Sequence, residues 1–198
     1  RFSDCVKTFL NHGLEIDDPA LLAVLTNDAA LLEQYLHEDP DRISRRYSFR
    51  AAYTPIEEAS LLHICAEFNL VACAEALLKY GADVNFTAGV DEDGFGGQTP
   101  IFHTVNQNSN QSSGMMDLLL SHSADLSITV PGLVWGKGYE WETLVPAVNP
   151  ISYAMMGLLP QMHRDEKTIA RIVSRLLKQR YGIDYHPQNI PNAYLTRK

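Results

Sequence analysis

The sequence has little cysteine, no long apolar run and fewer basic than acidic residues. Three cysteines among 198 residues are too few for a disulfide framework, so we expect a reducing environment and an intracellular, cytoplasmic location. No apolar run reaches the roughly 18 residues that a membrane-spanning helix needs, so we expect no membrane contact of that kind. The formal net charge of −8 disfavours nucleic acid as a partner of the surface as a whole.

The length and composition predict one globular domain with its own core. Domains of about 150 residues are typical, and a hydrophobic share of 45% with a charged share of 20% is ordinary for a globular chain. The first residue is Arg1 rather than Met, so we expect a fragment or a trimmed chain. Basic residues concentrate in residues 42–56 and 164–198, where they either form solvated surface or orient an approaching partner.

Two segments, residues 60–85 and 97–125, repeat one pattern of helix, break, second helix and turn. In the second segment, Thr99 is a favourable N-cap and Pro100 suits the first helical position, where its missing N–H costs nothing. In the first segment, Gly81 falls where the end of a helix needs a left-handed residue. Repeats of this length predict a stack in which each helix pair packs on its neighbours.

This pattern resembles the ankyrin-repeat family. The match over residues 60–85 rests on Leu62, His63, Ala66, Leu77, Leu78, Gly81, Ala82, Asp83, Val84 and Asn85, and the match over residues 97–125 on Gly97, Thr99, Pro100, Leu119, Leu120, Ala124 and Asp125. The sequence departs from the family at Ser60 and Leu61, at Phe102 and at Ser123, which stand in place of Thr-Pro, His and Gly. The resemblance implies that His63 is a structural hydrogen-bonding residue between repeats.

Weaker repeats flank these two segments. Residues 17–41 contain a plausible cap, Asp18, and residues 148–182 contain a long helix over about 165–181 that ends at Gly182. We also expect a leading helix over residues 2–11 and an irregular tail over 183–198. The prediction is an all-α solenoid of about four ankyrin-like helix-pair repeats with long inter-repeat turns and essentially no sheet. Its single domain spans 1–182, with repeats at about 17–41, 59–85, 97–125 and 148–182.

Three connections, 42–59, 86–98 and 126–149, are longer than the turns of a regular stack. Connections above about 12–15 residues in a compact domain are usually functional or disordered. The 86–98 connection contains Asp91-x-Asp93-Gly94, which is similar to the start of a calcium loop but lacks a third acidic ligand and the distal Glu. A flexible acidic connector and partner contact through Phe86 or Phe95 are the alternatives.

The other two long connections carry aromatic residues. Residues 134–141 predict a small hairpin with Gly-Lys-Gly at its turn, and they hold both tryptophans of the chain. These tryptophans either anchor a partner or fold back over the apolar gap that the insertion creates. The 42–59 connection combines arginines such as Arg46 and Arg50 with aromatic side chains, a pattern that suits RNA or an acidic peptide.

No catalytic constellation is visible in the sequence. His63 and Cys65 are two residues apart, so on a helix they face different sides and cannot form a nucleophile–base pair. Cys65 and Cys73 occupy small core positions, and no histidine pair with zinc-ligand spacing accompanies them. We therefore expect no enzyme activity, no cofactor and no metal.

The ankyrin resemblance implies a protein–protein interaction module, a scaffold that binds a protein partner on its concave face and enlarged turns. The sequence does not identify this protein partner. We expect no nucleic acid and no membrane as a partner. The residues expected to bind it are Arg46, Arg50, Phe68, Phe86, Phe95, Asn106, Gln107, Trp135, Tyr139 and Trp141. The alternative is a structural or regulatory segment of a larger chain that docks onto a catalytic domain outside this sequence.

Overall fold

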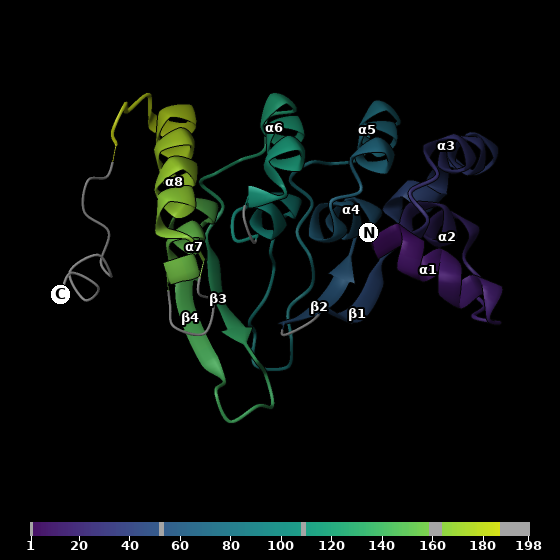
Figure 1. The fold of residues 1–198 in the computed structure, drawn as a ribbon, viewed down its shortest axis with the longest axis horizontal. Coiled ribbons are helices and arrows are strands. Elements are labelled where there is room, and N and C mark those ends of the chain that lie inside the picture. The colour runs from purple at the N-terminus through teal and green to yellow at the C-terminus, as the bar shows by residue number, and fades with distance from the viewer. Residues whose placement is uncertain (1, 52–53, 108–109, 159–163, 187–198) are drawn as a thin grey trace.

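Helix pairs stand side by side in a row along the molecule (Figure 1). The computed structural model describes residues 2–51, 54–107, 110–158 and 164–186. The four pairs are α2 (Pro19–Leu25) with α3 (Ala29–Glu38), α4 (Leu61–Phe68) with α5 (Val71–Lys79), η2 (Pro100–Thr104) with α6 (Ser113–Ser121), and α7 (Pro150–Met155) with α8 (Glu166–Tyr181). Short 3-10 helices, η1 (Pro40–Ser44) and η4 (Met156–Leu158), follow α3 and α7. A further helix, α1 (Phe2–Asn11), precedes the row, as predicted for residues 2–11.

Local capping explains where several helices begin and end. The Asp18 carboxylate accepts the N–H groups of Ala20 and Leu21 at the start of α2, which confirms the predicted cap. The last helix, α8, ends at Gly182 in the left-handed conformation, with φ +68°. The expected long helix and its C-cap are therefore confirmed. None of the described helices is long and apolar enough to cross a membrane.

One continuous apolar core runs along the row from Ala20 to Leu176. The second helices contribute leucines such as Leu77 and Leu119, which are fully buried. Small side chains on α4, Cys65 and Ala66, are also fully buried and let the neighbouring helices approach closely. Each pair therefore buries its apolar faces against the pairs beside it.

The prediction of an all-α fold with essentially no sheet is wrong. Strands β1 (Tyr47–Ala51) and β2 (Thr54–Ala59) pair antiparallel, and so do β3 (Val130–Trp135) and β4 (Thr143–Val148). The second hairpin buries Leu133 and Val145 in the helical core, so its backbone needs internal hydrogen bonds. Antiparallel pairing supplies these bonds, whereas an irregular connection would leave polar groups unsatisfied. A hairpin with Gly-Lys-Gly in its turn is confirmed, but its bounds differ from the predicted 134–141, because residues 136–142 all belong to the turn and the second strand begins at Thr143.

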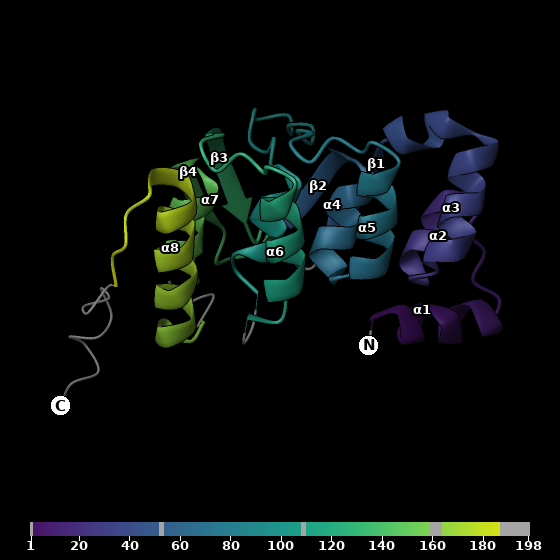
Figure 2. The same ribbon diagram turned by 90° about the horizontal axis from the view of Figure 1, so that it is seen from above.

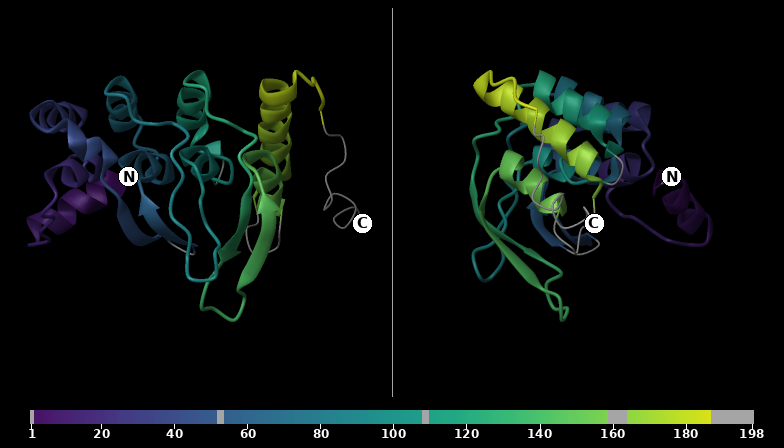
Figure 3. Two further views of the ribbon diagram at one scale, coloured as in Figure 1. Left: turned by 180° about the vertical axis from the view of Figure 1, so that it is seen from behind. Right: turned by 60° about the vertical axis from the view of Figure 1, so that its left-hand side comes forward.

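The 86–98 connection, here called the acidic loop, joins the two hairpins. The N–H of Gly89 donates to the Glu57 carbonyl of β2 at 2.7 Å, and the N–H of Gly96 donates to the Gly132 carbonyl of β3 at 3.0 Å. Its own two arms are linked by the Val90–Gly96 bridge. The hairpins and the acidic loop thus form one array along the same side of the helix row (Figures 2 and 3).

The third pair begins differently from the expectation. Its first helix, η2, is a 3-10 helix, and the Thr99 side chain makes no capping hydrogen bond. The Thr99 hydroxyl is instead buried and has no hydrogen-bond partner among the described residues. Pro100 does occupy the first helical position, so this part of the prediction is confirmed.

Candidate functional site

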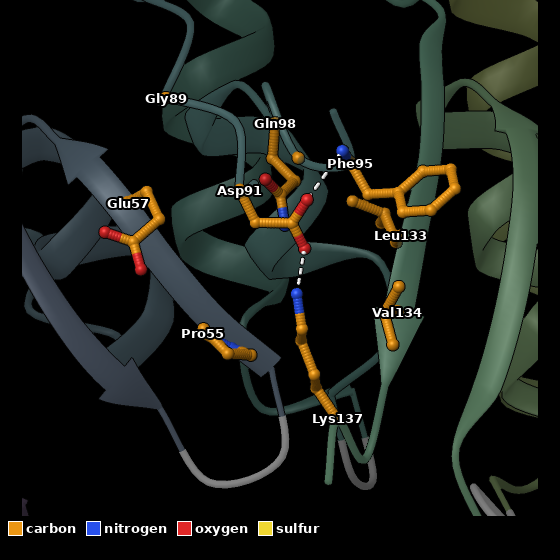
Figure 4. Close-up of a pocket in the computed structure, with 10 residues that line it drawn as sticks. Pro55, Glu57, Gly89, Asp91, Phe95, Gln98, Leu133, Val134 and Lys137 are labelled. Carbon is orange, nitrogen blue, oxygen red and sulfur yellow. Dashed lines mark hydrogen bonds and ion pairs between the residues drawn. The ribbon is translucent and has the colours of Figure 1, made fainter. Parts of the chain in front are cut away.

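A lysine fastens the turn of the β3–β4 hairpin to the acidic loop (Figure 4). The Lys137 ammonium lies 2.8 Å from Oδ2 of Asp91 and 3.2 Å from Oδ2 of Asp93. The other Asp91 oxygen accepts the N–H groups of Asp93 and Phe95. The ammonium therefore faces the two carboxylates that the sequence suggested as the start of a calcium loop. Within the described ranges, no group of three or more His, Cys, Asp or Glu side chains could hold a metal ion.

The electrostatics of this contact keep both partners charged. Hydrogen bonds to Asp91 and Asp93 raise the pKa of Lys137. Burial acts to raise the pKa of Asp91, but the bonds from Lys137 and the Phe95 N–H outweigh it, so the pKa of Asp91 is lowered. The pocket beside them, between Glu57, Gln98 and Val134, has a volume of about 20 Å³. This space is sufficient for about one water molecule and too small for an organic ligand.

The aromatic side chains of the hairpin take two different positions. Trp135 turns toward the helices, where its indole N–H donates to the Tyr153 hydroxyl at 3.2 Å. Trp141 packs edge-on against Trp135 and stacks with Tyr139, with centroid distances of 6.5 and 5.1 Å. Tyr139 is 55% exposed and Trp141 36% exposed. One tryptophan therefore folds back onto the stack, while the other forms, with Tyr139, an exposed aromatic pair at the hairpin tip.

Phe68, expected to meet a partner, is covered by the chain itself. The ring of Phe2, at the start of α1, stacks on Phe68 with a centroid distance of 3.8 Å and an interplanar angle of 8°. Phe49 of β1 lies 6.3 Å from the same ring. The side chain expected at a partner interface thus belongs to an aromatic cluster between α1, α4 and the first hairpin.

The other predicted residues near the first hairpin and acidic loop also have intramolecular partners. The Arg46 guanidinium pairs with Glu58 at 3.0 Å and lies over the ring of Phe86 at 4.7 Å from its centroid. Phe95 packs against Gly132, where a Cβ atom would come within 2.9 Å of its ring. Arg50 lies in β1, and its side chain is outside the described residues.

Asn106 and Gln107 are separated by their surroundings although they are neighbours in sequence. Asn106 is only 8% exposed, and its amide donates to the Tyr153 carbonyl at 2.6 Å. The main-chain carbonyl of Asn106 accepts the Nε–H of Arg164 at 2.7 Å. Gln107 donates to the His103 carbonyl and lines an open groove beside α1. The structure thus brings Phe68 and Gln107 to the same groove and places Asn106 inside the stack.

His63 lies in the interior and links two repeats. Its Nε2–H donates to the Gln98 carbonyl of the next repeat at 2.9 Å, while Nδ1 accepts the Ser60 N–H at 3.2 Å. Burial, reinforced by the nearby His103, lowers the pKa of His63 to about 3, so the ring is neutral. Burial also raises the pKa of the Cys65 and Cys73 thiols, and no base contacts either sulfur atom in the described structure.

Sequence reasoning missed two residues that shape the surface, Lys137 and Phe2. Lys137 was recognised only as part of a turn, and its acidic partners lie more than 40 positions earlier. The acidic loop, with Asp91 and Asp93 close together, was a signal that a cation would be near. Phe2 carried no signal beyond its place in an amphipathic leading helix, because helix periodicity does not show which distant residue a side chain meets.

Comparison with known proteins gives one positive finding. A search of curated proteins finds no match for this chain. Residues 58–88, which include α4, α5 and the start of the acidic loop, match the family model of the ankyrin repeat. Such repeats are typically non-enzymatic modules for protein–protein interaction. The segment with the His63 bond to the next repeat is therefore similar to an ankyrin repeat, which confirms the resemblance over residues 58–88.

Proposed function

We propose that this chain binds a protein partner through the exposed aromatic pair at the tip of the β3–β4 hairpin. The ankyrin match over residues 58–88 supports protein interaction in general, and the hairpin supports this particular surface. Tyr139 and Trp141 stack on each other, so they lose little conformational entropy when a partner covers them. Leu144, on the same hairpin, is 50% exposed.

The fixed position of the tip is the observation that carries this proposal. An exposed aromatic side chain on a mobile loop would be costly to order, whereas this turn is held by Lys137 on the acidic loop and by Trp135 on α7. Trp141 also packs so closely over Gly136 that a Cβ atom there would overlap its ring. Aromatic anchors in fixed positions are typical centres of protein interfaces.

Site-specific photocrosslinking in the source cell tests this proposal. A photoreactive phenylalanine analogue at position 139 should capture a defined polypeptide, because Tyr139 is the most exposed aromatic side chain of the tip. The matched control carries the analogue at position 181, since Tyr181 is 54% exposed but lies at the end of α8. Capture at 139 that Trp141→Ala abolishes supports the proposal. The same products at both positions, or none at 139, contradict it.

The other predicted partner residues stay predictions. A partner that uses Phe68 competes with the Phe2 ring that covers it. Arg46 and Phe86 present a shared cationic and aromatic surface, which a partner contacts without breaking the Glu58 pair. The alternative, docking onto a catalytic domain of a larger chain, also stays a prediction, and a crosslink within one polypeptide would favour it.

A further inference from the structure

An open groove of about 710 Å³ lies between α1 and the turns that join the helices of the first three pairs. Figure 2 shows α1 running along the row, across the ends of the first two helix pairs. One wall is the N-terminal half of α1. The other wall comes from three successive pairs, through Asn27, Asn69, Gln107 and Gln111. This volume lies in the range of ligand-binding sites in proteins.

Carboxamide side chains dominate the wall that the helix pairs provide. Asn27 and Asn69 lie at the turns in the left-handed conformation, with φ of +54° and +55°. This backbone conformation sets the position of each Cβ atom at its turn. Within the described structure, the Asn27 and Gln111 side chains make no hydrogen bond, and Asn69 uses only its amide N–H, toward the Gln111 carbonyl. A carboxamide offers donors and an acceptor together, which matches the N–H and C=O groups of a peptide backbone.

The spacing of these turns suits an extended chain. Neighbouring packed helices lie about 8–10 Å apart, so groups on successive turns are separated by a similar distance. An extended polypeptide advances about 3.3 Å per residue and therefore passes one turn about every three residues. Three turns correspond to a segment of roughly seven residues. A helical segment is less suitable, because its backbone groups are already paired internally.

The charge of the groove indicates which side chains the segment carries. Two acidic residues, Asp4 and Glu67, line the groove, against one basic residue, Lys7. The chain as a whole carries a formal net charge of −8. Both favour approach of a basic segment. The stacked rings of Phe2 and Phe68 add an apolar surface on which the stem of a lysine or arginine can lie.

We propose that this groove binds an extended, basic segment of a partner polypeptide. The carboxamides of Asn69 and Gln111 pair with its main chain, and α1 forms the second wall. The inference rests on the proposed role in protein interaction, but it uses a surface separate from the hairpin tip. Failure at one surface therefore does not imply failure at the other.

The experiment uses a phage-displayed library of random linear nonapeptides, selected on the full chain. Enriched peptides are synthesised with a fluorescent label, and their Kd is measured by fluorescence anisotropy. The test variant combines Asn69→Gly with Gln111→Ala. Glycine keeps the positive φ that Asn69 adopts, so the turn is retained while its carboxamide is removed. Circular dichroism and thermal melting confirm that the variant folds.

The expected result is a set of peptides rich in Lys and Arg whose Kd rises about tenfold or more in the double variant, as the loss of two hydrogen bonds implies. The matched control, Tyr181→Ala at the exposed end of α8, should leave the Kd unchanged. The photocrosslink from position 139 should persist in the double variant, because the hairpin tip does not line the groove. Enrichment of no peptide, or of peptides that the double variant binds equally well, overturns the groove proposal. If the chain selects no peptide but binds glycans on an array, and the double variant loses that glycan binding, the peptide assignment is overturned.

Discussion

Acid should destabilise this protein through one buried ring, that of His63. The ring is fully buried, and its Nδ1 acts as an acceptor for the Ser60 N–H. Protonation would place a second N–H against that donor and a charge in an apolar interior. The groups that face the ring are Ser60, the Gln98 carbonyl and His103, whose ring centroid is 5.6 Å away and whose Nδ1 contacts Glu67.

The size of the effect follows from the two pKa values. The folded-state pKa of His63 is lowered to about 3, below the ordinary value of 6.5. Because the unfolded chain binds the proton first, this contribution to stability is fully present above pH 6.5 and is lost as pH falls through 6.5 toward 3. At about 1.5 pH units below the ordinary pKa, that is at pH 5, protonation stabilises the unfolded chain by about 2 kcal/mol. The free energy of unfolding falls by the same amount.

Urea unfolding at pH 7.5 and pH 5.0 measures this loss. In the wild-type chain the free energy of unfolding should fall between these pH values by about 2 kcal/mol more than in His63→Gln, which cannot titrate. The variant is expected to be less stable at pH 7.5 by about 1–3 kcal/mol, because it disturbs buried hydrogen bonds. His122→Gln is the matched control, because it removes an exposed histidine and its pH dependence of the free energy of unfolding is measured in the same way. Equal pH dependence in wild type and His63→Gln would refute the reasoning.

Three further predictions concern the hairpin array. Gly96→Ala should cost about 2–3 kcal/mol, because φ is +126° and the new Cβ would lie 2.7 Å from a backbone oxygen, whereas Gly94→Ala, in open space, should cost about 1 kcal/mol in the same urea assay. Lys137→Gln should increase amide hydrogen exchange in the acidic loop, with unchanged exchange in α5 as the internal control. Trp135→Phe removes the hydrogen bond to Tyr153, so the free energy of unfolding should fall by about 1 kcal/mol in the urea assay. An unchanged free energy of unfolding would show that this bond contributes nothing.

The helices could be predicted from the sequence because their signals are local. The cap at Asp18, the left-handed Gly182 and the small face around Cys65 each act within one or two turns of a helix. The hairpins were less visible, since Pro131 and Pro146 interrupt the alternation that marks a strand. Their pairing depends on burial against a core assembled from distant helices, which no local pattern contains.

The candidate site was predictable in composition but not in arrangement. The aromatic and acidic character of the long connections marked Tyr139, Trp141 and the acidic loop as candidate partner contacts, and the structure places all of them on one array. Which aromatic side chains are covered could not be predicted. Phe68 and Trp135 look equally available in the sequence, yet Phe2 stacks on the first and Tyr153 accepts a hydrogen bond from the second.

The contacts between repeats combine apolar packing with directed polar pairs. His63 on α4 reaches the Gln98 carbonyl just before η2, and His103 on η2 contacts Glu67 of α4 at 2.8 Å. Asn106, after η2, donates to the Tyr153 carbonyl of α7. Leucine and alanine faces alone tolerate small shifts, whereas a buried hydrogen bond is lost when its partners move by about an ångström.

These polar pairs therefore fix how far each helix pair is displaced from the next, and with it the position of everything the pairs carry. The hairpins and the acidic loop connect the same helix pairs along the chain. The hydrogen bonds between them form only if neighbouring pairs are correctly displaced from one another. The carboxamides of the groove lie on the turns of the same pairs, so their spacing depends on the same displacement. A substitution that removes a polar pair, such as His63→Gln, should accordingly weaken peptide binding in the groove without touching its lining.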